Sequence, residues 1–224
     1  MSKLSSLMQK NKMTLIAEVP DNDVGLADVA THAGADVLLL RINTHSLNDF
    51  ETERDNLEKL LAHAKVPVGL SAGWEKLLRR DELAEIDQLG FDFINIGIEH
   101  LSSSMVGTEH IAKVLKLNSR FSLDDIVEVS RHSYLAMDAA IVPTSGWGRD
   151  LIVGDLQNYI SIVLSSALPI IVPTQRLIKA SEVAIISDTG ARGLILTPVV
   201  CGTSAKHLRR AVAEFRGAID ALEN

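Results

Sequence analysis

The segment His32–Ile42 reads HAGADVLLLRI, and this order of residues decides the fold. A turn containing Gly34 ends an amphipathic stretch, and a continuously apolar run follows, which is typical of a helix leading into a strand buried on both faces. The same order recurs in Gln88–Ile98, QLGFDFINIGI, and in Asp188–Val199, DTGARGLILTPV. The recurrence predicts βα units that build a parallel sheet.

Outward from these segments, short runs rich in Val, Ile and Leu alternate with longer amphipathic stretches along the chain. We expect strands at Thr14–Val19, Val37–Ile42, Val66–Ser71, Phe93–Gly97, Ala112–Leu117, Ala139–Val142, Pro169–Pro173 and Gly193–Thr197. We expect helices at Val24–Ala33, Asp49–Ala64, Glu75–Leu89, Leu123–Arg131, Leu156–Ser166, Ser181–Thr189 and Ala205–Leu222. This pattern predicts a single-domain (β/α)8, or TIM, barrel over residues 1–224, with an open doubly wound sheet as the alternative.

The stretch His100–Asn118 is where the closed barrel is in doubt. Its run TEHIAKVLKL, from Thr108, could itself be a helix instead of containing the fifth strand. In that case seven strands remain and the sheet does not close.

Composition narrows the classes of partner. The formal net charge of -7 argues against a nucleic-acid surface, which needs clustered Lys and Arg. No apolar run approaches the ~20 residues of a membrane span. The single cysteine, Cys201, cannot form a disulfide within the chain, so we expect a reducing, cytoplasmic location. We expect a small anionic molecule as the partner, and a homo-oligomer is left open.

In a TIM barrel, functional groups lie at the C-terminal ends of the strands and in the loops just after them. Glu18 lies in the apolar strand LIAEVP, and a buried carboxylate must be paired or have a raised pKa. It is a candidate general acid or base, or alternatively the structural ion-pair partner of Arg41 on the next strand. Lys116 is a candidate Schiff-base lysine, with a solvated surface lysine as the alternative.

Further candidates to bind the substrate follow the other strands. They are Asn95, Thr144, Trp147, Arg149, Thr174, Gln175, Gly202, Thr203 and Ser204. The loop PTSGWGRD, from Pro143, is long enough to form a lid over the site, or it is an ordinary surface turn. Gly202–Ser204 open the last helix, where free N–H groups and hydroxyls would bind a phosphate or carboxylate, or simply cap the helix.

Metal and cofactor motifs are not evident. The seven histidines form no HxxxH or HExxH pattern, and Cys201 stands alone, so we expect neither a metal site nor a cofactor.

The closing quarter of the chain resembles a known superfamily. The run EVAIISDTGARGLILTPVVCG, from Glu182, follows PIIVPTQ, from Pro169, and both resemble the end of ribulose-phosphate-binding barrels. These include indole-glycerol-phosphate synthases, tryptophan synthase α chains and keto-deoxy-phosphogluconate aldolases. LIAEV and GADVLLLR look like their openings. Where those families carry a Gly-rich phosphate loop after strand seven, this chain has Pro173–Gln175, which weakens the phosphate expectation.

The sequence therefore favours an enzyme of small-molecule metabolism. We expect an aldolase-like lyase or an isomerase, acting on a small anionic carbonyl or hydroxy-acid substrate that could be phosphorylated. Glu18 would be the acid or base, Arg41 and Asn95 would orient the substrate, and Lys116 would act as an electrophile or Schiff base. The alternative is a barrel that binds or senses a phosphate or carboxylate ligand without turnover, because fold alone does not establish activity.

Overall fold

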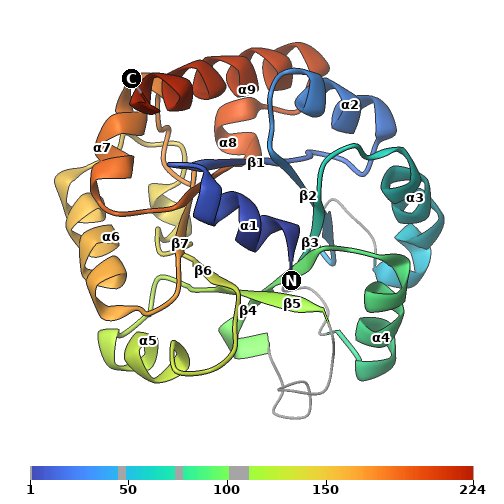
Figure 1. The fold of residues 1–224 in the computed structure, drawn as a ribbon, viewed down its shortest axis with the longest axis horizontal. Coiled ribbons are helices and arrows are strands. Elements are labelled where there is room, and N and C mark those ends of the chain that lie inside the picture. The colour runs from blue at the N-terminus through green and yellow to red at the C-terminus, as the bar shows by residue number, and fades with distance from the viewer. Residues whose placement is uncertain (1, 45–48, 74–77, 101–110, 224) are drawn as a thin grey trace.

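The computed structural model describes residues 2–44, 49–73, 78–100 and 111–223. Its helices and strands alternate along the chain (Figure 1). In order they are α1 (Lys3–Lys10), β1 (Thr14–Glu18), α2 (Val24–His32), β2 (Val37–Ile42), α3 (Phe50–His63), β3 (Val68–Ala72), α4 (Arg80–Leu89), β4 (Phe93–Gly97), η1 (Ile98–His100), β5 (Ala112–Lys116), α5 (Leu123–Val129), β6 (Ala136–Asp138), η3 (Thr144–Gly146), α6 (Val153–Ser165), β7 (Ile170–Pro173), η4 (Ala180–Glu182), α7 (Val183–Asp188), β8 (Gly193–Leu196), α8 (Pro198–Cys201), α9 (Ala205–Asp220) and η5 (Ala221–Glu223).

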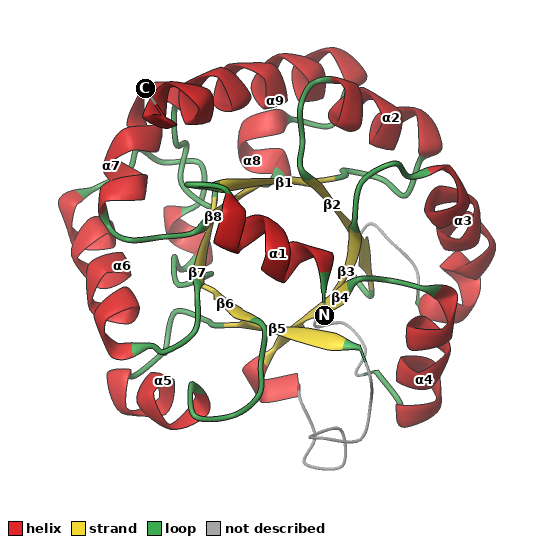
Figure 2. Cartoon of the chain, in the orientation of Figure 1, coloured by secondary structure: helices red, strands yellow, loops and turns green. Residues whose placement is uncertain are grey.

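The strands form a closed parallel barrel in the order β1 to β8, with β1 paired to β8. Figure 2 shows the ring of strands inside a ring of helices. The predicted (β/α)8 barrel is therefore confirmed, and so is its fifth strand, since Ala112–Lys116 pairs with β4 and β6. None of the described helices is long and apolar enough to cross a membrane.

Apolar side chains pack in two clusters, one on each side of the barrel wall. The larger lies between the strands and the surrounding helices. The smaller fills the barrel interior and consists of Leu4, Met8, Ile16, Val37, Leu39, Phe93, Val114, Ala136, Ile171 and Ile195. Because Leu4 and Met8 belong to α1, this helix closes the N-terminal end of the barrel, across which it lies in Figure 1.

Helix α1 is absent from the sequence-based expectations, and Asp92, just before β4, explains how it is held. The Asp92 carboxylate accepts hydrogen bonds from Ser2 Oγ at 2.7 Å, Lys3 N at 2.7 Å and Leu4 N at 2.8 Å. These contacts satisfy N–H groups that the first turn of a helix leaves without intrahelical partners. A side chain about ninety positions away caps the helix.

Strand six differs from the prediction. It spans Ala136–Asp138, whereas Ala139–Val142 lies beyond the strand, although Ala139 N still donates to Ile171 O at 2.8 Å. The apolar run AAIV was mistaken for the strand because it is the more hydrophobic segment. The shift matters, because it makes Asp138 the last residue of β6.

Candidate functional site

Five polar side chains converge at the C-terminal end of the barrel interior. Side chains alternate between the two faces of a strand, so a residue two positions after an interior one also points inward. Each member of the group follows an interior residue in this way, namely Glu18 after Ile16, Arg41 after Leu39, Asn95 after Phe93, Lys116 after Val114 and Asp138 after Ala136. We call these five residues the rim cluster. It combines two carboxylates, two cations and an amide.

Glu18 and Arg41 form an ion pair on neighbouring strands. Arg41 Nε lies 3.2 Å from Glu18 Oε1, and Arg41 Nη2 donates to Pro20 O at 2.6 Å. Asn22 fixes the backbone there, since its amide group donates to Arg41 O at 2.8 Å and accepts from Arg41 N at 3.3 Å. Burial raises the pKa of Glu18, and the charges of Arg41 and Lys116 oppose that rise.

Asn95 and Asp138 form a second pair, from β4 and β6. Asn95 Nδ2 donates to Asp138 Oδ2 at 2.7 Å, and each residue is only 1% exposed. The remaining oxygen of each side chain, Asn95 Oδ1 and Asp138 Oδ1, is buried without a hydrogen-bond partner. Burial raises the pKa of Asp138, while Lys116 and the Asn95 hydrogen bond oppose the rise. Two buried acceptors thus await donors, a costly arrangement in the absence of a ligand.

Lys116 ends β5, which lies between the strands of Asn95 and Asp138. Its charge acts on both Glu18 and Asp138, yet no carboxylate among the described residues forms an ion pair with it. The neighbouring Lys113 has the opposite parity to Val114, so it points away from the interior. Only Lys116 of these two lysines is therefore placed for chemistry in the barrel mouth.

Cys201 is buried at the end of α8. Burial and the charge of Glu18 raise the pKa of the thiol to about 12, so it is protonated at neutral pH and a poor nucleophile. Across the described residues, no group of three or more His, Cys, Asp or Glu side chains could hold a metal ion.

The loop after β6 is hydrogen-bonded to its surroundings. Thr144 and Arg149 are exposed, and Trp147 is 40% exposed while its Nε1 donates to Val142 O at 3.0 Å. Gly148 N donates to Gln175 O at 3.0 Å, which joins this loop to the one after β7. The structure does not bring Thr144, Trp147 or Arg149 into the rim cluster.

Arg176 locks the same two loops together. Its guanidinium donates to both carboxylate oxygens of Asp155, at 2.8 and 3.1 Å, and to Gly146 O at 3.0 Å. Both charged side chains are about nine-tenths buried. Nothing in the sequence relates Arg176 to Asp155, which lies 21 positions earlier in the chain.

The candidates Thr174, Gln175 and Ser204, after β7 and β8, form hydrogen bonds with their own or neighbouring segments. Thr197 N donates to Thr174 Oγ1 at 2.8 Å, and Thr197 Oγ1 donates to Thr174 O at 2.9 Å. Gln175 Oε1 accepts from Val142 N at 3.0 Å. Ser204 caps α9, since its hydroxyl accepts from His207 N at 3.3 Å.

The other two residues of that segment lie beside the cap. Gly202 is partly buried with a φ of 62°, and Thr203 is exposed. The helix-capping alternative for Gly202–Ser204 therefore describes what Ser204 does in the structure.

Asp138 is the rim-cluster residue that sequence reasoning missed. A pattern was available to find it, because LAMDAAIV, from Leu135, contains a lone carboxylate in an apolar run, as LIAEVP does around Glu18. The predicted strand six starts three residues too late and therefore leaves Asp138 outside it.

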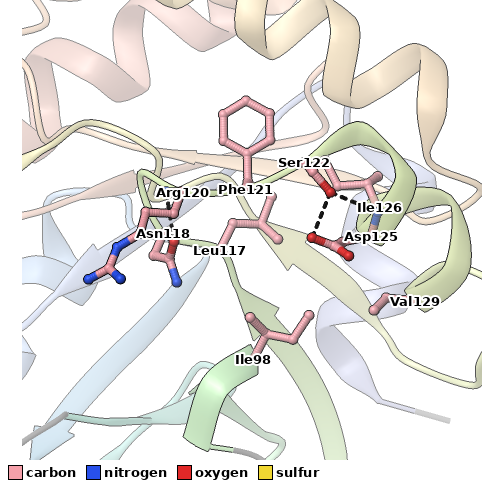
Figure 3. Close-up of a pocket in the computed structure, with 9 residues that line it drawn as sticks. All are labelled: Ile98, Leu117, Asn118, Arg120, Phe121, Ser122, Asp125, Ile126 and Val129. Atoms are coloured by element: carbon pink, nitrogen blue, oxygen red, sulfur yellow. Dashed lines mark hydrogen bonds between the residues drawn. The ribbon is translucent and has the colours of Figure 1, made fainter.

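A separate pocket of about 120 Å³ lies beside the end of β5. It is lined by Ile98, Leu117, Asn118, Arg120, Phe121, Ser122, Asp125, Ile126 and Val129 (Figure 3). Three of its polar side chains have partners, since Ser122 Oγ donates to Asp125 Oδ2 at 2.6 Å and Asn118 Nδ2 donates to Glu99 Oε2 at 3.0 Å. No rim-cluster side chain lines it, so the pocket does not share the chemistry of the barrel mouth.

Comparison with known proteins supports the fold. No family model matches the sequence, and no curated protein does. Thiamine phosphate pyrophosphorylase from Pyrococcus furiosus is 16% identical with a TM-score of 0.69, over 96% of this chain and 100% of that one. Tryptophan synthase from M. tuberculosis, in its aminoacrylate-bound form, is 13% identical with a TM-score of 0.73, over 98% and 100%.

A mutant tryptophan synthase alpha-subunit from Pyrococcus furiosus is 14% identical with a TM-score of 0.72, over 91% of this chain and 98% of that one. Tryptophan synthase α chains are among the families that the sequence resembles, so the resemblance is confirmed at the level of the fold. The similar structures are of enzymes, but at these identities the similarity carries no substrate across.

Proposed function

We propose that the chain is an enzyme that moves a proton on a small anionic carbonyl or hydroxy-acid substrate in the barrel mouth, in a lyase or isomerase reaction. The observation that carries the proposal is Asp138, a buried carboxylate with one oxygen fixed by Asn95 and the other without a partner, electrostatically coupled to Lys116. A group that must take up and release a proton near neutral pH works best when its pKa is raised toward that range.

The rim cluster supports a division of roles. Asp138 Oδ1 would remove a proton from the substrate, and the bond from Asn95 would hold the carboxylate in place. The Lys116 ammonium would stabilise negative charge that develops on the substrate oxygen, or its free amine would add to the carbonyl and form an iminium with loss of water. Glu18, whose carboxylate is paired with Arg41, would act as a second acid or base.

Exchange of substrate hydrogens with solvent tests the proposed proton transfer. The protein is incubated in D2O with a panel of small hydroxy acids, keto acids and aldoses, and loss of C–H signals is followed by proton NMR. We expect exchange or cleavage of one class of compound, abolished in Asp138→Asn and retained in Asp55→Asn, a matched change on the exposed face of α3. Exchange that persists in Asp138→Asn would assign the base elsewhere.

The two roles of Lys116 can be separated by chemical trapping. Borohydride reduces an iminium to a stable adduct, which intact-protein mass spectrometry detects. An adduct formed by the native protein and by Lys59→Met, but not by Lys116→Met, would support the Schiff base. Turnover without any adduct would leave Lys116 as an electrostatic catalyst.

The second candidate is a ligand-sensing barrel without turnover. The observation that favours it is the Glu18–Arg41 ion pair, which already satisfies the charge of one proposed acid and is compatible with a purely structural role. Saturable binding of a panel member, with no exchange and no adduct, would support this candidate over the enzyme.

A further inference from the structure

We infer that the substrate of the proposed reaction is an unphosphorylated hydroxy acid, bound through its hydroxyl and carboxylate groups at the rim cluster. The inference rests on the proposed function and adds the substrate class. Many TIM barrels bind phosphate with the loops after strands seven and eight and the N-terminus of a short extra helix. This chain has all of those elements, with α8 as the short helix, so the use of their donors can be compared with what a phosphate needs.

The start of α8 offers few backbone donors. Its first residue is Pro198, which has no N–H. The N–H groups of Val200 and Cys201 both donate to Thr197 O at 3.0 Å, and Gly202 N donates to Pro198 O at 2.9 Å. A phosphate at this position would compete with hydrogen bonds that hold the helix.

Side chains of the loops after β7 and β8 already form hydrogen bonds or ion pairs within the protein. The hydroxyls of Thr174 and Thr197 tie the end of β7 to that of β8, and Thr174 is fully buried. Arg176 is neutralised by Asp155, and Lys179, further along the loop after β7, has its Nζ 3.5 Å from Asp150 Oδ1. Glycines let a backbone approach a ligand closely, but the chain has none at the end of β7, where Pro173 is followed by Thr174 and Gln175.

The rim cluster, in contrast, has buried acceptor oxygens that lack hydrogen-bond donors. Asn95 Oδ1 and Asp138 Oδ1 are buried acceptors without donors, whereas an ionised phosphate offers acceptor oxygens. A hydroxyl group supplies the hydrogen that these oxygens lack. Lys116, which forms no ion pair with the described carboxylates, supplies the charge that a substrate carboxylate requires. A hydroxy acid therefore satisfies both the acceptors and the cation.

Matched pairs of ligands test the inference. Calorimetric titration at constant ionic strength compares lactate with phospholactate, glycerate with 3-phosphoglycerate and gluconate with 6-phosphogluconate. We expect at least one acid to bind at least about tenfold more tightly than its phosphate ester, since a site built around hydroxyl donors rejects groups that leave it unpaired. Inorganic phosphate should not compete.

Variants locate the binding. Asp138→Asn and Lys116→Met should each weaken the acid by about tenfold or more, whereas Asp55→Asn and Lys59→Met on α3 should not. Circular dichroism establishes that each variant is folded, and Lys116→Met decides the result if Asp138→Asn is not. An ester that binds as tightly as its acid, or a panel in which no unphosphorylated acid binds, would overturn the inference.

The same panel separates this inference from the proposed function. Selective binding of an unphosphorylated acid without hydrogen exchange would contradict the proposed reaction and support the inferred ligand class. Exchange of hydrogens on a phosphate ester would support the proposed reaction and contradict the inferred ligand class.

Discussion

The two ends of the barrel are made by the same strands, yet their inward side chains differ in kind. At the N-terminal end, Leu4 and Met8 of α1 pack on apolar residues such as Phe93. Two positions further along β4, Asn95 joins a cluster that contains buried charges. The comparison teaches that one end contributes stability, whereas the other holds buried carboxylates and unpaired acceptors that cost folding free energy, a division common in TIM barrels.

The largest expected effect is on the proposed reaction at the C-terminal end. Asp138→Asn should lower turnover by ~10²–10⁴-fold, because it removes the group proposed to transfer the proton. The free energy of unfolding at neutral pH should not fall, because an ionised carboxylate whose pKa is raised by burial destabilises the folded state. Steady-state kinetics and urea unfolding measure the two quantities, and a loss of both together would assign Asp138 a structural role.

The apolar end should respond in the opposite way. Leu4→Ala removes a fully buried side chain from the interior cluster and should lower the free energy of unfolding by ~2–5 kcal/mol. Leu164→Ala, at an 81% exposed position on α6, is the matched control and should change it by less than ~0.5 kcal/mol. Equal effects of the two variants in urea unfolding would show that α1 does not close the barrel.

Removing the cap of α1 should have a smaller effect. Asp92→Ala leaves three donors at the start of the helix without their acceptor and should lower the free energy of unfolding by ~1–2 kcal/mol. Faster hydrogen exchange of the α1 amides, measured by NMR, would locate the loss. Unchanged exchange in α1 would contradict this account of the cap.

The two buried carboxylates of the C-terminal end should make stability depend on pH. Burial raises the pKa of Glu18 above 4.5 and that of Asp138 above 3.8, so the folded state holds more protons than the unfolded state between those values and the raised ones. Stability should therefore fall as pH rises through this window, by up to ~1.4 kcal/mol per pH unit for each group. Urea unfolding across the window should show a flatter profile in Glu18→Gln/Asp138→Asn. Parallel profiles would mean that neither carboxylate is destabilised by burial.

The smallest expected effect concerns a sequence-predicted anion site. Ser204→Ala should cost ~1 kcal/mol of stability, as Ser122→Ala should at α5, because both hydroxyls cap helices. Affinity for the rim-cluster ligand should stay within about twofold of the native value in both variants. A selective loss of affinity in Ser204→Ala would restore the anion site.

Much of the fold could be predicted from the sequence because continuously apolar runs identify strands buried on both faces. The run VLLLRI is such a strand, and the glycines that end the preceding helices do have positive φ, as Gly34 and Gly190 show. Helix α1 was missed because KLSSLMQK is short and mostly polar, and its apolar positions make sense only once the open end of a barrel needs covering.

The candidate site was predicted in part. Four residues could be placed together because each lies at or near the end of a predicted strand. Side chains alternate between the two faces of a strand, so these four can point into the same interior. They are Glu18, Arg41, Asn95 and Lys116. The hydrogen bonds of Thr174, Gln175 and Arg176 could not be predicted, because each needs a partner that comes near only when the sheet closes. Hydrogen bonds between distant segments carry no periodic pattern in a sequence.

The closure of one end by α1 also limits the routes by which a ligand can reach the barrel interior. With Leu4 and Met8 packed in the N-terminal end of the barrel interior, a ligand of the rim cluster would enter and leave at the C-terminal end. If the proposed reaction takes place there, a bound product excludes the next substrate, so we expect competitive inhibition by the product.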